Sequence, residues 1–225
     1  MASASLAIVG GTGALGRGLA ARALRHGLTV CIGSRAEERA RAVAEELRRD
    51  IAGAEVTGAA LAAAAAAGEV IAITVPFAAQ LETLRAIREA ARGKIVLDAT
   101  VPLVPPRVAR VQLPPEGSAA VRAQKELGPD VRVVSALHTV AAARLGSDAV
   151  AEEIGDVLVF GDDKASREAV VALLARMELS ALHGGSLANS AATEAFTSVL
   201  IFLNKQYHAD HAGLKVTGLG THRPA

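Results

Sequence analysis

Short apolar runs alternate with amphipathic stretches along most of the chain. Several runs have the continuous apolar character of strands buried on both faces of a parallel sheet, namely residues 6–9, 28–32, 70–75, 95–98 and 131–137. The stretches between them place apolar residues at helical spacing, as Ala40, Val43, Ala44 and Leu47 do within residues 36–49. This alternation of strand and helix predicts an α/β fold built on a doubly wound parallel sheet.

The pattern continues in a shorter form after residue 145. It predicts strands at 156–160 and 179–183, a helix that reaches residue 177, and a long helix that begins near residue 188. We therefore expect two parts, a main domain of residues 1–145 and a small C-terminal α/β domain of residues 146–225. Residues 99–117 contain five prolines and are expected to form an extended connection without regular structure.

Clustered glycines follow the first apolar run directly. Gly11, Gly13 and Gly16 have the spacing that allows a sharp turn, a close approach of backbone to phosphate, and tight packing of the next helix on its strand. An ordinary turn is the alternative reading of such a glycine-rich segment. Because a strand precedes the glycines and an amphipathic helix follows them, we favour a dinucleotide whose pyrophosphate lies on Gly11, Thr12, Gly13, Ala14, Leu15 and Gly16.

The end of the second strand indicates which dinucleotide is bound. An NAD site usually has an acidic residue there, whereas this chain has Ser34 and Arg35, with Arg39 one helical turn later. A hydroxyl and two guanidinium groups suit a 2′-phosphate, so we predict NADP. The alternative is that both arginines are solvated residues of a charged helix.

Two further strands deliver residues to the same sheet edge. Residues 70–75 end at Thr74, Val75 and Pro76, whose backbone is expected to face the ribose and nicotinamide. Residues 131–137 lead to His138 and Thr139. His138 is either a ligand-facing residue or a buried structural histidine. Hydride transfer between two stacked planar rings needs no acid or base at the reacting carbon, which fits a chain that shows no evident acid–base pair.

Composition and charge exclude several other functions. The net charge is +1, with 24 basic and 23 acidic residues and no basic run, so neither nucleic-acid nor membrane-surface binding is suggested. The single cysteine, Cys31, rules out an internal disulfide, and no targeting segment is evident, so we expect a cytoplasmic protein. No metal site is predicted, because His208 and His211 suit the C-terminal end of a helix better than a ligand set.

Several segments in this order resemble coenzyme F420-dependent NADP reductases: GGTGALGRGLA, IGSRAEERA, ITVPF, VVSALHTVAAARL, VFGDD and LANSAATEAFTSVLIFLN. The resemblance covers almost the whole chain. It implies an N-terminal Rossmann domain, a small C-terminal domain and a homodimer. It also implies a reversible hydride transfer between C4 of the nicotinamide of NADP and C5 of the deazaflavin F420, with both as small-molecule co-substrates.

The resemblance also implies residue roles. Ser34, Arg35 and Arg39 would bind the 2′-phosphate, while Thr12 and His138 are the candidates for a direct part in the reaction. The cleft for the two rings would be lined and closed by Val75, Pro76, His138, Thr139, Val140, Ala142, Asn189, Ser190, Ala212, Gly213 and Leu214. 

The chain departs from the family pattern on the deazaflavin side. Ala141 stands in place of an expected proline, and Ala188 in place of a small polar residue. Two other functions therefore stay open: an NADP-dependent reductase of another planar heterocycle, such as a pterin or flavin, and a non-catalytic NADP-binding sensor. The apolar helix after Ala188 has more apolar surface than one core needs, which is consistent with a dimer interface.

Overall fold

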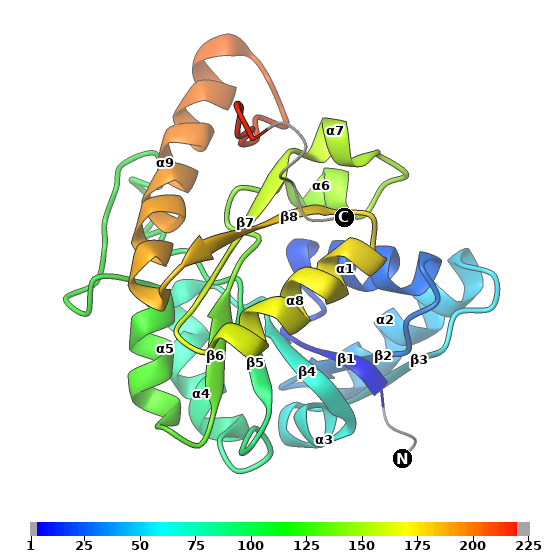
Figure 1. Cartoon of the computed structure of the whole chain (residues 1–225). Helices are drawn as coiled ribbons and strands as arrows, with labels where there is room; N and C mark the ends of the chain where they lie inside the picture. The colour runs from blue at the N-terminus through cyan, green and yellow to red at the C-terminus, as the bar shows by residue number, and fades with distance from the viewer. Residues whose placement is uncertain (1–3, 220–225) are drawn as a thin grey trace.

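A single sheet with helices on both faces forms the centre of the molecule (Figure 1). The computed structural model describes residues 4–219. The eight strands of the sheet lie in the order β3-β2-β1-β4-β5-β6-β7-β8. They are β1 (Ala4–Val9), β2 (Val30–Ser34), β3 (Val56–Ala60), β4 (Gly68–Ile73), β5 (Ile95–Asp98), β6 (Arg132–Ser135), β7 (Asp156–Gly161) and β8 (Ser180–Gly185).

Most strands are buried on both faces, as their apolar character predicts, whereas the edge strands β3 and β8 each have an exposed residue. Alternate residues of β1 point to opposite sides, so that Leu6 and Ile8 belong to one core layer while Ala7 and Val9 belong to the other. Helices α1 (Ala14–Arg25), α2 (Glu37–Asp50) and α8 (Lys164–Arg176) cover the first layer. Helices α3 (Leu61–Ala67), α4 (Gln80–Ile87) and α5 (Ala119–Leu127) cover the second.

The first six strands have the strand order of a dinucleotide-binding α/β sheet, 3-2-1-4-5-6, and run parallel. The order reverses direction between β1 and β4, which is where such sheets bind ligands. The predicted Rossmann-type sheet is therefore confirmed.

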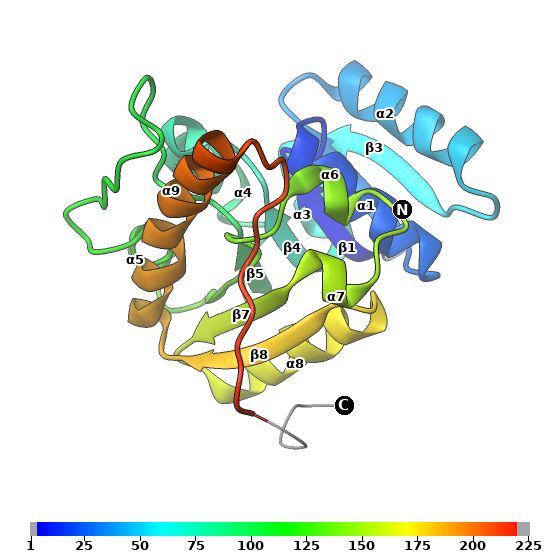
Figure 2. The same cartoon turned by 90° about the horizontal axis from the view of Figure 1, so that it is seen from above.

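The direction of β7 was not predicted. β7 pairs antiparallel with β6, and the register joins Val134 to Gly161 and Ser135 to Phe160. β8 then pairs parallel with β7. Because β7 ends where it meets β6, its first residues extend past the carboxyl edge of the parallel strands and form a wall there (Figure 2).

The remaining helices lie around this wall. They are α6 (Ala142–Leu145), α7 (Ala151–Ile154) and α9 (Ser190–Tyr207), with a one-turn 3-10 helix at Leu187–Asn189, while a second 3-10 helix at Phe77–Ala79 leads into α4. The connection 99–117 contains no helix or strand, as its prolines predict, and runs on the same side of the molecule as α9 in both views (Figures 1 and 2). Ser118 ends this connection by accepting a hydrogen bond from the Val121 amide, and so caps α5.

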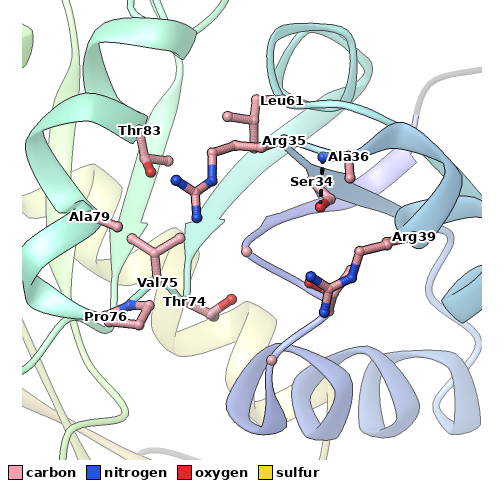
Figure 3. Close-up of a pocket in the computed structure, with 13 residues that line it drawn as sticks. Ser34, Arg35, Ala36, Arg39, Leu61, Thr74, Val75, Pro76, Ala79 and Thr83 are labelled. Atoms are coloured by element: carbon pink, nitrogen blue, oxygen red, sulfur yellow. Dashed lines mark hydrogen bonds between the residues drawn. The ribbon is translucent and has the colours of Figure 1, made fainter.

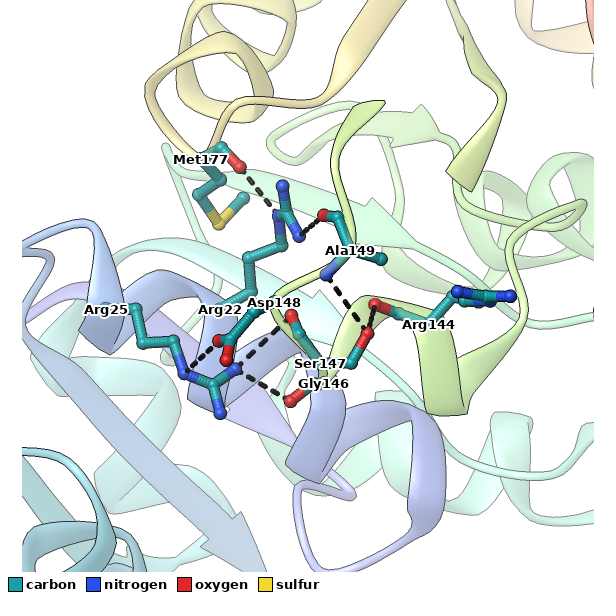
Figure 4. Close-up of polar contacts among 8 residues, drawn as sticks. All are labelled: Arg22, Arg25, Arg144, Gly146, Ser147, Asp148, Ala149 and Met177. Atoms are coloured by element: carbon teal, nitrogen blue, oxygen red, sulfur yellow. Dashed lines mark hydrogen bonds and ion pairs between the residues drawn. The ribbon is translucent and has the colours of Figure 1, made fainter. Parts of the chain in front are cut away.

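Arg22 on α1 joins the C-terminal segments to the first half of the sheet (Figure 4). Its guanidinium is buried and donates to the carbonyls of Met177 at 2.7 Å, Ala149 at 2.9 Å and Glu178 at 3.2 Å. Arg25, one turn further along α1, donates to the Gly146 carbonyl and pairs with Asp148. The continuous sheet and these contacts pack the segments on either side of residue 145 directly against each other.

Candidate functional site

A cleft of about 350 Å³ lies at the carboxyl edge, at the point where the strand order reverses. It is built by the loop after β1, the end of β2 with the start of α2, and the segment between β4 and α4 (Figure 3). Its lining residues are Gly10, Thr12, Gly13, Ser34, Arg35, Ala36, Arg39, Leu61, Thr74, Val75, Pro76, Ala79 and Thr83.

The loop after β1 turns at Gly10, one residue before the predicted motif. Gly10 has φ +87°, and a Cβ there would lie 2.5 Å from Cγ1 of Val75. Gly16 is required by close packing, because its Cβ would lie 2.5 Å from Cα of Gly11 and 2.7 Å from Oγ1 of Thr74. Both glycines bring the start of α1 close to the end of β4.

Gly13 differs from these two glycines. Its φ of −82° suits any residue, and a Cβ there would meet only the Gly10 carbonyl oxygen, at 3.5 Å. Gly13 is exposed and lines the cleft at the N-terminus of α1, where backbone N–H groups favour an anion. The protein itself does not require glycine here, so the open space suits a group that lies directly on the backbone. This arrangement fits a pyrophosphate.

The end of β2 supplies the polar groups on the other side of the cleft. Ser34 is buried, and its hydroxyl accepts a hydrogen bond from the Ala36 amide at 3.3 Å. The Arg39 side chain points back toward the glycine loop (Figure 3). Within residues 4–219 no carboxylate forms an ion pair with Arg39, so its charge is open to a ligand. Arg35 instead extends across the cleft toward α4 (Figure 3).

A second cavity, of about 270 Å³, lies between α9 and the segment after β6. It is lined by His138, Thr139, Val140, Ala141, Ala142, Ala143, Thr197, Leu200, Ile201, Asn204, Asp210, His211 and Ala212. The chain enters this segment through Leu137, which is buried and has a φ of +72°. A left-handed conformation costs a leucine about 1–2 kcal/mol, so the surrounding packing must hold the turn.

His138 is buried, and both of its ring nitrogens have partners. Nε2 lies 2.9 Å from the Ser135 hydroxyl, and Nδ1 lies 2.8 Å from the Thr193 hydroxyl. Burial lowers the pKa of His138 to about 3, so the ring is neutral near pH 7. The two hydroxyl groups are themselves anchored to backbone, since Thr193 donates to the Ser190 carbonyl and Ser135 donates to the Asp98 carbonyl. The structure therefore places the histidine ring between β6 and α9.

A buried acidic cluster holds α9 against the rest of the fold. The Glu194 carboxylate accepts from the amides of Ala119 at 2.6 Å and Ala120 at 3.2 Å, at the N-terminus of α5. Burial raises the pKa of Glu194 to about 7, and burial raises the pKa of the neighbouring Asp98 to about 6. Asp98 accepts from the Gln80 amide at 2.5 Å, and that same amide donates to the Ala119 carbonyl.

The two cavities together contain most of the predicted site residues. The first holds Thr12, Gly13, Ser34, Arg35, Arg39, Thr74, Val75 and Pro76, and the second holds His138, Thr139, Val140, Ala142 and Ala212. Gly11 and Gly16 lie behind the first cavity, while Ala14 lies beside it on α1. Leu15 packs partly buried against the core.

Four predicted residues lie outside the second cavity. Asn189 is exposed and donates to the Gly184 carbonyl, whereas Ser190 is fully buried and donates to Glu194. A Cβ added at Gly213 would lie 3.8 Å from the Thr139 carbonyl oxygen, so Gly213 is near the segment after β6. The carbonyl of Leu214 accepts a hydrogen bond from the Asp156 amide.

Sequence reasoning missed the wall formed by Leu61, Ala79 and Thr83. These residues belong to ordinary alanine- and leucine-rich helical stretches, which carry no signal of ligand binding. Only the strand order, which places α3 and α4 beside the glycine loop, could have indicated them.

Three further observations concern metals, membranes and the cysteine. No three His, Cys, Asp or Glu side chains among residues 4–219 are grouped so that they could hold a metal ion. Across the same residues, no helix has both the length and the apolar character needed to cross a membrane. Cys31 is a free thiol inside the core, and burial raises its pKa.

The sequence is similar to those of known proteins. Residues 5–102 match the family described as "NADP oxidoreductase coenzyme F420-dependent". The chain is 36% identical over 223 residues to an F420-dependent NADP reductase of Methanothermobacter thermautotrophicus, and the alignment covers 95% of each chain. It is 34% identical over 227 residues to the reductase of the same name from Methanocaldococcus jannaschii, which covers 95% of this chain and 98% of that one.

A solved structure agrees with the fold over the full length. A crystal structure from Arthrobacter sp. FB24, provisionally described as an F420-dependent NADP reductase, superposes with a TM-score of 0.83. It is 25% identical in sequence, and the match covers 96% of this chain and 100% of that chain. The glycine cradle at the switch point, the Ser34–Arg39 segment and these similarities lead to one conclusion: the chain belongs to the family of F420-dependent NADP reductases.

Proposed function

We propose that this protein transfers a hydride reversibly between NADP(H) and the deazaflavin coenzyme F420, directly from ring to ring. The nicotinamide gives or takes the hydride at C4, and the deazaflavin takes or gives it at C5. The observation that carries the proposal is the presence of two cavities at one sheet edge, one of them at the switch point and built around the glycine cradle. Membership of the family supports the identity of both co-substrates.

In this proposal the first cavity binds NADP(H). The loop after β1 binds the pyrophosphate through Gly11, Thr12, Gly13, Ala14, Leu15 and Gly16. Ser34, Arg35 and Arg39 bind the 2′-phosphate, and Thr74, Val75 and Pro76 face the ribose and nicotinamide, which Ala142 approaches from the second cavity. The open space at Gly13 and the unpaired charge of Arg39 within the described part of the chain support this assignment.

The second cavity and its rim bind F420. The proposed residues are His138, Thr139, Val140, Asn189, Ser190, Ala212, Gly213 and Leu214. The segments after β4 and β6 are separated by one intervening strand, so they lie roughly 10 Å apart. Two rings that stack between these segments would exclude water from the reacting carbons.

Thr12 and His138 contribute to this arrangement in different ways. Thr12 lies in the glycine loop and lines the cleft, where it can contact a bound ring. His138 positions the Thr139–Ala142 backbone, because its neutral ring is held on both sides by hydroxyl groups. The hydride transfer itself needs no proton from either side chain.

A spectroscopic assay tests the proposed function. Protein, NADPH and oxidised F420 are mixed, and the loss of the deazaflavin absorbance is followed. We expect turnover with F420, faster with NADPH than with NADH. Parallel reactions with a flavin and a pterin test the other heterocycles. Tight NADPH binding without turnover of any acceptor would instead support a non-catalytic sensor.

We further propose a cytoplasmic homodimer with residues 1–145 as the nucleotide-binding domain and residues 146–225 as the domain that completes the F420 side. The outer face of α9 supports the dimer, because Val199, Phe202 and Tyr207 are exposed there. A lone buried thiol, Cys31, is compatible with a reducing compartment.

A further inference from the structure

A third cavity adjoins the nucleotide cleft on its outer side. It has a volume of about 320 Å³ and is lined by Ser34, Arg35, Ala60, Leu61, Ala62, Glu82, Thr83 and Ala86. Four of these residues, Ser34, Arg35, Leu61 and Thr83, also line the first cleft. The two spaces are therefore neighbours, and Arg35 lies at the boundary between them.

The Arg35 side chain is oriented by a carboxylate on the opposite wall. It extends from the end of β2 across the cleft (Figure 3), and its Nη1 lies 3.9 Å from Oε2 of Glu82. Glu82 is in the first turn of α4, where the helix dipole favours a negative charge. The side chains are 70% and 74% exposed, so this ion pair is weak and readily exchanged.

Arg35 thus has two possible partners. In the free protein its partner is Glu82, which points it away from Arg39 and the glycine loop. A 2′-phosphate beside Ser34 would carry more negative charge than a carboxylate and would draw the guanidinium back toward the end of β2. The 2′-hydroxyl of NAD(H) offers no such charge, so Arg35 would stay with Glu82.

We propose that Glu82 competes with the 2′-phosphate for Arg35, and so sets both how strongly the protein discriminates NADP(H) from NAD(H) and how fast NADP(H) leaves. This inference rests on the proposed NADP(H) site and adds to it a residue on the opposite wall. Glu82 lowers the gain that the 2′-phosphate obtains from Arg35, because part of that gain replaces an existing ion pair. A modest affinity allows the nucleotide to leave after each hydride transfer.

The test compares Glu82→Gln with a matched control. Glu89→Gln makes the same charge change at an exposed residue that pairs with Arg92, beyond the end of α4 and at the opposite edge of the sheet. Dissociation constants for NADPH and NADH are measured by fluorescence titration at low salt for both variants and the wild type. The NADPH dissociation rate is measured by stopped flow.

We expect Glu82→Gln to tighten NADPH by about 2- to 5-fold, the range of an exposed ion pair, and to slow its release by a similar factor. NADH binding should change by much less, Glu89→Gln should change neither nucleotide, and added salt should shrink the effect. No change, equal tightening of both nucleotides, or weaker NADPH binding would each overturn the proposal.

A second background tests the role of Arg35. If Glu82 acts by holding Arg35, Glu82→Gln should tighten NADPH by clearly less in an Arg35→Ala protein than in the wild type. An equally large effect without Arg35 would mean direct repulsion of the phosphate and would overturn the competition. A wild-type protein that shows no preference for NADPH would instead contradict the proposed NADP site itself.

Discussion

At the scale of single residues, Gly13 is a glycine that the fold itself does not require, which makes it a test of the proposed ligand site. A methyl group there would meet only one protein atom within 4 Å, and the backbone has ordinary dihedral angles. Gly13→Ala should therefore leave the free energy of unfolding within about 1 kcal/mol of the wild type while it weakens NADPH binding at least tenfold, because the methyl group would occupy the proposed pyrophosphate site. Urea unfolding and NADPH titration measure the two effects.

Gly16→Ala is the matched comparison for Gly13→Ala. Its methyl group would lie within 3 Å of Gly11, Thr74 and Gly10 atoms, so α1 would have to shift. This variant should lose stability by roughly 1–3 kcal/mol, as other overpacked sites do. If both variants lost the same stability, the distinction between ligand-facing and packing glycines would be wrong.

His138 makes a prediction about pH. Its pKa is lowered to about 3 in the fold against 6.5 for the free side chain, because burial disfavours the imidazolium. The folded state thus binds a proton less readily than the unfolded chain. The stability that this neutral ring contributes is complete above about pH 6.5 and is lost progressively as the pH falls from there toward 3, at up to about 1.4 kcal/mol for each pH unit.

The measurement is urea unfolding between pH 7 and pH 5 for the wild type and His138→Gln. We expect the variant to be less stable at pH 7, since it loses a fitted hydrogen-bonding ring, and the difference between the two proteins to shrink as the pH falls. A difference that is constant over this range would show that His138 titrates normally in the fold.

At the scale of elements, Arg22 connects α1 to the end of α8. Its buried guanidinium donates to three backbone carbonyls, one of them at Met177, where α8 ends and the helix dipole favours a positive charge. Arg22→Ala would leave these carbonyls without partners. We expect a loss of roughly 2–4 kcal/mol in the free energy of unfolding, measured in urea.

Arg25→Ala is the control on the same helix. Arg25 is more exposed and pairs with a largely exposed Asp148, so its loss should cost less than about 1 kcal/mol. Equal losses for the two arginines would contradict the idea that burial of Arg22 makes its contacts strong.

Most elements could be predicted because their apolar patterns are local. The predicted strand at 95–98 matches the structure directly, and most other boundaries differ by a few residues. The reversal of β7 could not be predicted, since apolar content gives no strand direction and the short helices between β6 and β7 carry no distinctive pattern.

At the scale of the whole molecule, the candidate site was predictable where chemistry and strand ends coincide. Gly13, Ser34 and Thr74 lie at or just after the ends of buried strands, and parallel strands bring their ends to one edge. Leu61 and Thr83 were missed because their role depends on the order of strands in the sheet. The hydrogen bond between His138 and Thr193 depends on α9, because Thr193 lies 55 residues further along the chain, so both interpretations of His138 stayed open from the sequence.

Association of two chains is tested at the outer face of α9. Phe202 is 52% exposed beside Val199, and a carboxylate there would have to be buried in any interface that this face forms. We expect the wild type to have about twice the 22.9 kDa chain mass by light scattering, and Phe202→Asp to be monomeric. Val150→Asp, at a similarly exposed valine just before α7, should keep the wild-type mass. A monomeric wild type would contradict the proposed dimer.

The short ladder between β6 and β7 has a consequence for how proteins of this architecture can diverge. Two residue pairs connect the last two strands to the parallel sheet, and the segment before them, residues 136–155, contains only short helices and turns. Insertions or deletions in this segment would leave the register of β1 to β6 unchanged. The side proposed to bind F420 can therefore change its length and shape through many small mutations, while the glycine loop between β1 and α1 keeps its geometry.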